Sequence, residues 1–275
     1  MAKEKLSFKN GTKFCFSVKE NNLNDFYDKI IELSTLENEK DYIVELRLDY
    51  LINKKVDVED IIKCINKAKK DLSENYDIER QYIATLRNFT NGGNCYVDDK
   101  TYYDIIEKLY DKPCVDAIDI DYDFYEKKSS NIKKLFSKKK SLIITYTCRD
   151  KSLSIEEYDD VFKSLLKSPA YVVKIMTKAF SFDDTEKLME TARKYDEAFA
   201  DNKKLAVIIS TGKIGIISRV WYEYTNTVLI YLENGEYDII PNGDIDETIF
   251  NKYRKMLSTL DGFKNNNLLG TTNKK

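Results

Sequence analysis

A lysine lies inside an apolar, strand-like stretch of the chain, and its position suggests chemistry. Lys174 stands in the run YVVKIMT, residues 171–177, between two valines and an isoleucine. Lysine is almost never fully buried unless its charge is paired or used. In a desolvated pocket beside other cations a lysine favours its free amine, which attacks carbonyl groups to give a Schiff base. Lys174 is therefore a candidate nucleophile; the alternative is an internal salt bridge to Glu45 or Asp119.

Charged and hydroxyl side chains alternate with apolar ones in other strand-like runs. Residues two apart in a strand share a face, so Glu45 and Arg47 lie together in VELRLD, and Thr85 and Arg87 lie together in ATLR. The planar fork of arginine grips a carboxylate with two parallel hydrogen bonds. From these residues alone we predict a lyase or aldolase that acts on a small carboxylated keto compound. For each arginine the alternative is an ion pair within the protein.

The chain contains no histidine, and this absence excludes several kinds of active site. Ser-His-Asp and Cys-His nucleophile pairs and HExxH zinc sites all require the imidazole. The five cysteines are odd in number and form no CxxC pair, so neither a disulfide framework nor a zinc ribbon is indicated. Chemistry in this chain must use lysine, carboxylate, tyrosine or cysteine side chains.

Charge and hydropathy also narrow the classes of partner. The formal net charge is −2 and the isoelectric point about 5.6, so the overall charge does not indicate binding to nucleic acid. No segment approaches the roughly 18 consecutive apolar residues of a membrane span, and the first residues lack a signal-peptide core. We expect a cytoplasmic protein that binds a small molecule, with neither nucleic acid nor membrane as a partner.

Short apolar runs alternate with stretches of helical periodicity. Between the runs, apolar residues recur at i, i+3, i+4 and i+7, and Asp57 and Ser154 occupy cap-like positions before two such stretches. The strand-like runs are FCFSV (14–18), IVELRLD (43–49), YIATLR (82–87), AIDID (117–121), LIITYT (142–147), YVVKIM (171–176), LAVIIST (205–211) and VLIYL (228–232). The helical stretches begin near residues 25, 58, 101, 154 and 183.

This alternation predicts an α/β fold, a (β/α)8 TIM barrel in a single domain. We expect a short N-terminal extension at 1–12, the barrel at 13–262 and a flexible C-terminal tail at 263–275. In such barrels the functional residues lie at the C-terminal ends of the strands. Several cations at one mouth are costly to desolvate unless carboxylates or a bound anion compensate them.

Four segments, taken together and in order, resemble type I 3-dehydroquinate dehydratase. They are VELRLDYL, TLRNFTNGG, VVKIM and STGKIGIISR, and the resemblance runs from KFCFSV to NGDID. It implies a lyase of the shikimate pathway that converts 3-dehydroquinate to 3-dehydroshikimate and water through a lysine imine. It also implies that neither a metal nor a cofactor is used. Many members are dimers, so a homodimer is one expected state.

The resemblance assigns roles to particular residues. Lys174 takes the place of the imine-forming lysine, and Arg219 that of the arginine that holds the substrate carboxylate. The implied substrate contacts are Glu45, Arg47, Arg87, Ser17 and Asp244, the last aligned with a glutamine of the family.

The sequence departs from the family at its acid/base pair. Thr147 stands where the family has a histidine that takes the proton next to the imine, and Asn91 stands where a glutamate supports that histidine. A threonine hydroxyl is no base near neutral pH, and general acid–base catalysis typically contributes about 10²–10⁴-fold. We therefore expect imine formation with slow dehydration. Two alternatives stay open: a catalytically silent homologue that binds a shikimate-pathway acid, and a divergent Schiff-base lyase or aldolase acting on another keto acid.

Overall fold

The structure is a computed structural model that describes residues 6–36, 41–136, 141–233 and 245–259. The chain divides into two compact units. Unit 1 comprises Met1–Thr147 and Pro169–Val172, and unit 2 comprises Cys148–Ser168 and Val173–Lys275. In both units strands alternate with helices along the chain.

Unit 1 is built on parallel strands in the order β5-β4-β3-β2-β1. Their bounds are β1 (Lys13–Val18), β2 (Tyr42–Arg47), β3 (Tyr82–Thr85), β4 (Ala117–Asp121) and β5 (Ser141–Cys148). The register places Ser17 beside Glu45, and Asp121 beside Thr145. Polar side chains at the carboxyl ends of neighbouring strands therefore come together.

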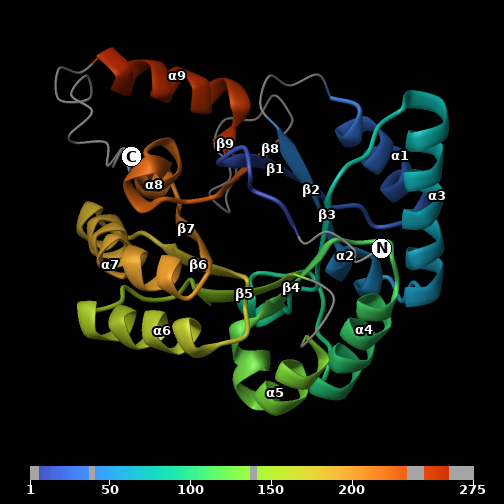
Figure 1. Cartoon of the computed structure of the whole chain (residues 1–275), viewed down its shortest axis with the longest axis horizontal. Helices are drawn as coiled ribbons and strands as arrows, with labels where there is room; N and C mark the ends of the chain where they lie inside the picture. Colours follow the sequence, from blue (N-terminus) through green and yellow to red (C-terminus); the bar gives the residue numbers. More distant parts are fainter. Residues whose placement is uncertain (1–5, 37–40, 137–140, 234–244, 260–275) are drawn as a thin grey trace. The chain divides into compact units, whose positions relative to one another are not determined.

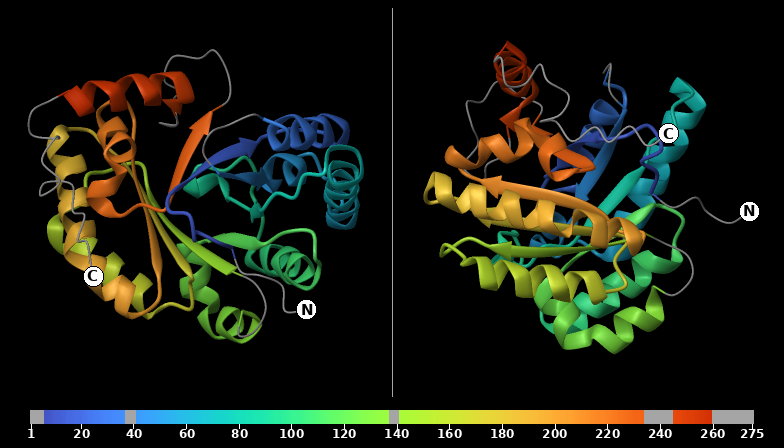
Figure 2. Two further views of the ribbon diagram at one scale, coloured as in Figure 1. Left: turned by 45° about the horizontal axis from the view of Figure 1, so that its top comes forward. Right: turned by 60° about the vertical axis from the view of Figure 1, so that its left-hand side comes forward.

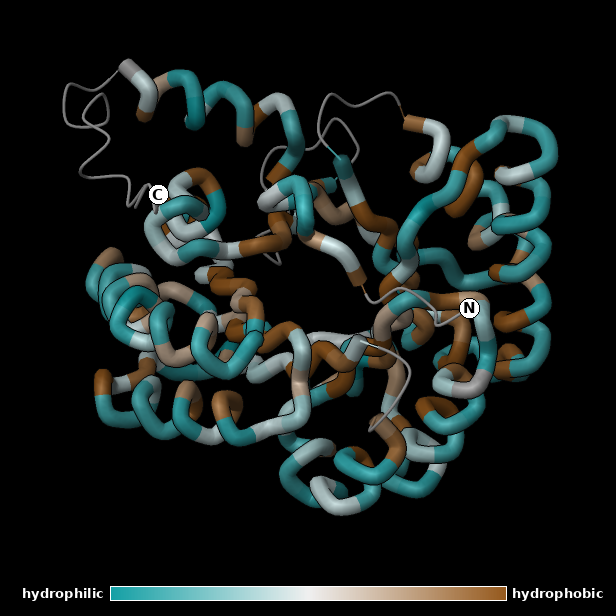
Figure 3. Tube along the Cα trace, viewed as in Figure 1, coloured by the Kyte–Doolittle hydropathy of each residue, from teal (hydrophilic) through white to brown (hydrophobic). Residues whose placement is uncertain are grey.

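Helices of unit 1 bury their apolar stripes against these strands. Figure 1 shows α1 and α3 side by side, and Figure 3 shows brown apolar positions alternating with teal polar ones along α3. Ile61, Ile65 and Leu72 of α3 are almost completely buried, as the spacing of an amphipathic helix requires. The helices are α1 (Leu23–Ser34), α2 (Leu48–Asn53), α3 (Val58–Tyr76), η1 (Phe89–Asn91), α4 (Asp99–Asp111) and α5 (Tyr122–Leu135).

Unit 2 carries β6 (Val172–Lys178) hydrogen-bonded beside β7 (Leu205–Thr211), and β8 (Leu229–Glu233) parallel to β9 (Ile245–Asp246). A parallel bridge between Ala206 and Thr227 joins β7 to the residues just before β8. Helices α6 and α7 lie side by side in both views of Figure 2. The helices of this unit are α6 (Ile155–Lys167), α7 (Phe182–Asp201), η2 (Ile214–Ile216), α8 (Ile217–Val220), η3 (Tyr222–Thr225) and α9 (Glu247–Thr259).

The predicted elements are largely confirmed, including two helix caps. The Asp57 side chain accepts a hydrogen bond from the Glu59 N–H, and Ser154 forms a capping box with Glu157. The prediction of a strand over 43–49 is wrong at its end, because β2 stops at Arg47 and the next residues turn into α2. Asp49 therefore lies on a helix and faces Arg47 from there.

The predicted domain boundaries fall partly outside the described residues. The tail at 263–275 lies outside them, as do residues 1–5 of the predicted extension. Residues 6–12 belong to unit 1, where Leu6 is buried and its N–H donates to Ser141 Oγ at 3.0 Å. The single-domain organisation stays a prediction. In the described part of the chain no helix is both long and apolar enough to cross a membrane.

The turn after β3 depends on a glycine. Gly93 N–H donates to the Asn88 carbonyl at 3.0 Å, and the backbone of Asn88 forms a parallel bridge with Cys95. A Cβ at Gly93 would lie 1.7 Å from the Arg87 carbonyl oxygen. The turn can close only with a hydrogen at this position.

We expect Gly93→Ala to destabilise the protein by about 3 kcal/mol, the upper end of the range for overpacked sites, because the added Cβ would clash with the backbone. Urea unfolding of the full chain measures the free energy. Gly11→Ala is the control, because Gly11 has φ +92° but nothing lies within 4 Å of its added Cβ. Backbone strain alone costs about 1 kcal/mol there. Equal losses in the two variants would contradict the steric account.

Candidate active site

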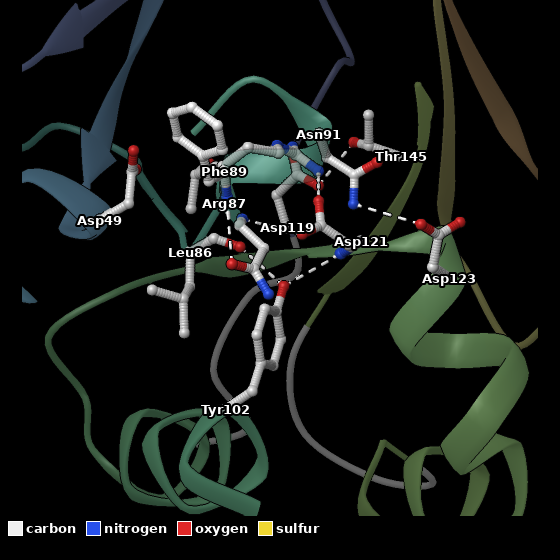
Figure 4. A network of polar contacts seen from close by, with 12 residues as sticks. Asp49, Leu86, Arg87, Phe89, Asn91, Tyr102, Asp119, Asp121, Asp123 and Thr145 are labelled. Carbon is white, nitrogen blue, oxygen red and sulfur yellow. Dashed lines mark hydrogen bonds and ion pairs between the residues drawn. The ribbon is translucent and has the colours of Figure 1, made fainter. Parts of the chain in front are cut away.

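Arg87 is the centre of a buried ion cluster in unit 1. Its Nη1 donates to Asp121 Oδ1 at 2.5 Å and its Nη2 to Asp119 Oδ2 at 2.7 Å (Figure 4). Burial by itself lowers the pKa of Arg87, but the two adjacent carboxylates more than offset this and raise it well above its usual value. Burial raises the pKa of Asp121, and the Arg87 charge opposes that change. The pair holds an ionised guanidinium inside the protein.

The two carboxylates that hold Arg87 are themselves fixed by neighbouring groups. Thr145 Oγ1 donates to Asp119 Oδ1 at 2.6 Å, and the Asn88 N–H donates to Asp121 Oδ2 at 3.0 Å. Each of these donors lies on a strand or on the first residues after one. The geometry of the cluster is therefore set by the sheet rather than by flexible side chains.

A tyrosine locks the backbone around the same cluster. Tyr102 of α4 donates its hydroxyl to the Leu86 carbonyl at 2.6 Å and accepts from the Asp121 N–H at 3.0 Å. Its ring stacks on Phe124 with 4.2 Å between centroids. Burial raises the pKa of Tyr102 well above its ordinary value, so the hydroxyl keeps its proton. One side chain thus ties the ends of β3 and β4 together.

Arg47 is held by a carboxylate from α2. Its Nε and Nη2 donate to the two oxygens of Asp49, each at 2.8 Å, in a bidentate pair. The Asn94 N–H donates to the same carboxylate at 2.8 Å, and Asp49 is fully buried. Burial acts to lower the pKa of Arg47, but Asp49 and Glu45 raise it above its usual value.

Glu45 accepts hydrogen bonds from both adjacent strands. Ser17 Oγ of β1 donates to Oε2 at 2.6 Å, and Thr85 Oγ1 of β3 donates to Oε1 at 2.7 Å. Only 3% of Glu45 is exposed, so two short hydroxyl bonds replace water around a buried carboxylate. Ser17 is the register partner of Glu45, whereas Thr85 lies two residues beyond the partner of Glu45 in β3, Ile83, and reaches it diagonally on the same face.

Arg47 and Arg87 therefore make the internal ion pairs that were the alternative to a substrate role. Four buried carboxylates face two guanidinium groups in this cluster: Glu45, Asp49, Asp119 and Asp121 against Arg47 and Arg87. An excess of acceptors suits a ligand that offers hydroxyl donors better than one that offers only a carboxylate.

Neither group at the predicted acid/base positions is a base. Asn91 ends η1, and its Nδ2 lies 3.5 Å from Asp123 Oδ2, at the long limit of a hydrogen bond (Figure 4). Thr147 Oγ1 is buried near the end of β5 and makes no hydrogen bond within the described part of the chain. An amide and an aliphatic hydroxyl take no proton from carbon near neutral pH.

Lys174 belongs to unit 2 and is 4% exposed. Thr177, three residues later in β6, points the other way and lies 3.1 Å from the Tyr158 hydroxyl of α6. Strand alternation therefore turns Lys174 away from this helix. Its Nζ lies 3.7 Å from the centroid of the Tyr231 ring in β8. The sequence analysis missed Tyr231, which looks like one more apolar strand residue in VLIYL.

Arg219 lies on the short helix α8 and is 1% exposed. A serine fixes this helix on β7: Ser218 Oγ accepts from the Ser210 N–H at 2.9 Å and donates to the Gly215 carbonyl at 2.8 Å. The guanidinium is therefore carried by a rigid turn. Asp244, the remaining predicted contact, lies outside the described residues. Within the described ranges no group of three acidic or cysteine side chains is placed to hold a metal ion.

Several solved structures of similar fold are 3-dehydroquinate dehydratases. A type I enzyme from Clostridium difficile, solved with covalently modified comenic acid, has a TM-score of 0.76 at 19% identity, covering 90% of this chain and 92% of that one. The enzyme from Geobacillus kaustophilus has a TM-score of 0.75 at 15% identity, covering 91% and 92%. These likenesses confirm the predicted barrel class of fold.

Sequence comparison finds the same kind of enzyme. The catabolic 3-dehydroquinate dehydratase of Acinetobacter baylyi is 24% identical over 222 residues, which are 76% of this chain and 79% of that protein. The model of the type I 3-dehydroquinase family matches residues 14–236, most of the chain. The chain therefore belongs to the type I 3-dehydroquinase family.

Proposed function

We propose that this protein converts 3-dehydroquinate to 3-dehydroshikimate and water through an imine on Lys174, and that the dehydration step is slow. The observation that carries the proposal is the placement of Lys174, 4% exposed on the face of β6 that turns away from α6. The family supports a lyase, and a buried primary amine is the nucleophile that its imine chemistry needs. A place in the cytosolic shikimate pathway follows from the same proposal.

The reaction consumes and returns the lysine. The amine attacks the ketone carbon, and the carbonyl oxygen leaves as water to give an iminium ion. The iminium withdraws electrons from the adjacent carbon, a proton is removed there, and the hydroxyl one carbon further leaves as a second water. Water then cleaves the imine and frees Lys174. The net change is the loss of one water from the substrate.

Slow proton removal follows from the side chains at positions 147 and 91. A histidine at the first position would accept the proton, whereas Thr147 offers a hydroxyl and Asn91 an amide. Binding is divided between charges of opposite sign: Arg219 holds the substrate carboxylate, and Glu45 accepts from substrate hydroxyls. Ser17, Arg47, Arg87 and Asp244 are the remaining proposed contacts. The excess of carboxylates in the Arg87 cluster supports this division.

A silent homologue that binds the same acid without turnover is the second candidate. The chain has no histidine, and Thr147, which the family resemblance aligns with the proton acceptor, has a buried hydroxyl. This candidate predicts thermal stabilisation by 3-dehydroquinate with no covalent adduct. A divergent aldolase would instead form the adduct and cleave a carbon–carbon bond.

Sodium borohydride with 3-dehydroquinate is expected to add the mass of a reduced adduct to the peptide that contains Lys174. Lys174→Met should abolish the adduct, because no other amine replaces the nucleophile. Lys204→Met is the matched control: Lys204 is also buried in unit 2, burial lowers its pKa, and its Nζ donates to the Ser168 carbonyl at 2.6 Å. An adduct that survives in Lys174→Met would exclude this lysine as the nucleophile.

Thr147→His combined with Asn91→Glu is expected to raise the rate of dehydration by about 10²–10⁴-fold, because it restores a general base and its support. The absorbance of the conjugated product measures turnover. Thr147→Val has nearly the shape of threonine and should give no increase. A wild-type rate that the histidine cannot improve would show that another group already serves as the base.

Arg219→Met should weaken binding of 3-dehydroquinate about 10- to 150-fold, the range for losing a hydrogen bond to a charged group. Thermal stabilisation as a function of ligand concentration gives the affinity. Arg193→Met on the exposed face of α7 removes the same charge elsewhere in unit 2 and should leave binding within about twofold. Unchanged affinity in Arg219→Met would place the substrate carboxylate on another residue.

A further inference from the structure

The contact between Lys174 and Tyr231 joins two buried side chains that are far apart in the sequence. The Nζ atom lies over the ring face, 3.7 Å from the centroid, and each residue is 4% exposed. Cations within about 6 Å of an aromatic centroid are attracted by its quadrupole, most strongly where water is excluded. The ring is thus placed against the atom that the proposed reaction uses.

The strands explain why these two side chains meet. Within unit 2, β7 is the hydrogen-bonded neighbour of β6, and the Val228 N–H before β8 donates to the Ala206 carbonyl of β7 at 3.0 Å. β6 and β8 are therefore alternate strands with β7 between them. In a (β/α)8 barrel the side chains of alternate strands share one interior layer. The contact is built into the strand order and does not depend on a mobile loop.

The charge that appears on nitrogen in the imine step gives the ring a chemical role. The neutral amine of Lys174 adds to the ketone carbon, and with one proton from solvent the carbonyl oxygen leaves as water, which gives a positive iminium. An aromatic face attracts the iminium but not the neutral amine, so the ring favours this step. A tyrosine side chain has few rotatable bonds and holds this arrangement with little reorganisation.

We propose that Tyr231 is a further catalytic residue, whose ring face holds the Lys174 nitrogen and stabilises the iminium formed on it. This inference rests on the proposed imine function. It assigns the effect to the aromatic face and none of it to the phenolic hydroxyl. It differs from simple core packing, in which any side chain of similar volume would serve.

Borohydride trapping of Tyr231 variants tests the proposal. Tyr231→Phe keeps the face and should trap 3-dehydroquinate within about threefold of the wild-type rate. Tyr231→Leu removes the quadrupole and should trap about 10- to 30-fold more slowly, as expected for a desolvated cation–π contact. Phe162→Leu, a buried aromatic of α6, is the packing control and should lower stability while leaving the trapping rate unchanged.

The outcomes distinguish failure of the proposed role of Tyr231 from failure of the proposed imine function of Lys174. If the wild type is trapped and Tyr231→Leu is trapped at the same rate, the proposed role of Tyr231 is overturned while the imine function stands. If Tyr231→Phe is slowed as much as Tyr231→Leu, the effect belongs to the hydroxyl, and the proposed role of the ring face is overturned as well. No adduct in the wild type overturns the imine function and the inference together.

A double-mutant cycle tests the contact without substrate. The destabilisation caused by Tyr231→Leu is measured by urea unfolding in the wild type and in Lys174→Met. A coupling of about 5- to 30-fold in the unfolding equilibrium is expected if the ring attracts the lysine charge. Additive effects would show that the two side chains only touch, and would overturn the proposal.

Discussion

Buried charge is the constraint around which unit 1 is organised. A guanidinium taken out of water is strongly unfavourable unless carboxylates compensate it with good geometry and their remaining oxygens are also bonded. Arg87 meets this condition through Asp119 and Asp121, which in turn accept from Thr145 and from the Asn88 backbone. The parallel register of β3, β4 and β5 brings these partners together, and the ion pairs in turn stabilise this register over others.

The strand alternation visible in the sequence identified much of this cluster. Alternate polar positions in VELRLD and AIDID correctly placed Glu45 beside Arg47 and Asp119 beside Asp121, since the period of two in a strand is a local property. The end of β2 could not be found in this way. Asp49 continues the alternation in the sequence, but the chain turns into α2 there. Its carboxylate pairs locally with Arg47 and accepts from the distant Asn94 N–H.

Contacts between distant strands were beyond the sequence. Nothing in VLIYL distinguishes Tyr231 from its apolar neighbours, because its role depends on facing Lys174 from another strand. The same holds for Tyr102, which was visible only as a helical residue, yet its hydroxyl bonds the backbone of two strand ends. Periodicity gives the face of a residue, whereas its partner across the sheet depends on register and strand order.

The ion pairs of unit 1 have a consequence for the end of β5. None of the bonds that compensate Arg47 and Arg87 involves Thr147, whose buried hydroxyl makes no hydrogen bond within the described part of the chain. Exchange of the residue at that position leaves the charges of Arg47 and Arg87 balanced. The residues that balance these buried charges and the residue at position 147 are therefore separate sets, so a replacement at position 147 does not disturb the ion pairs.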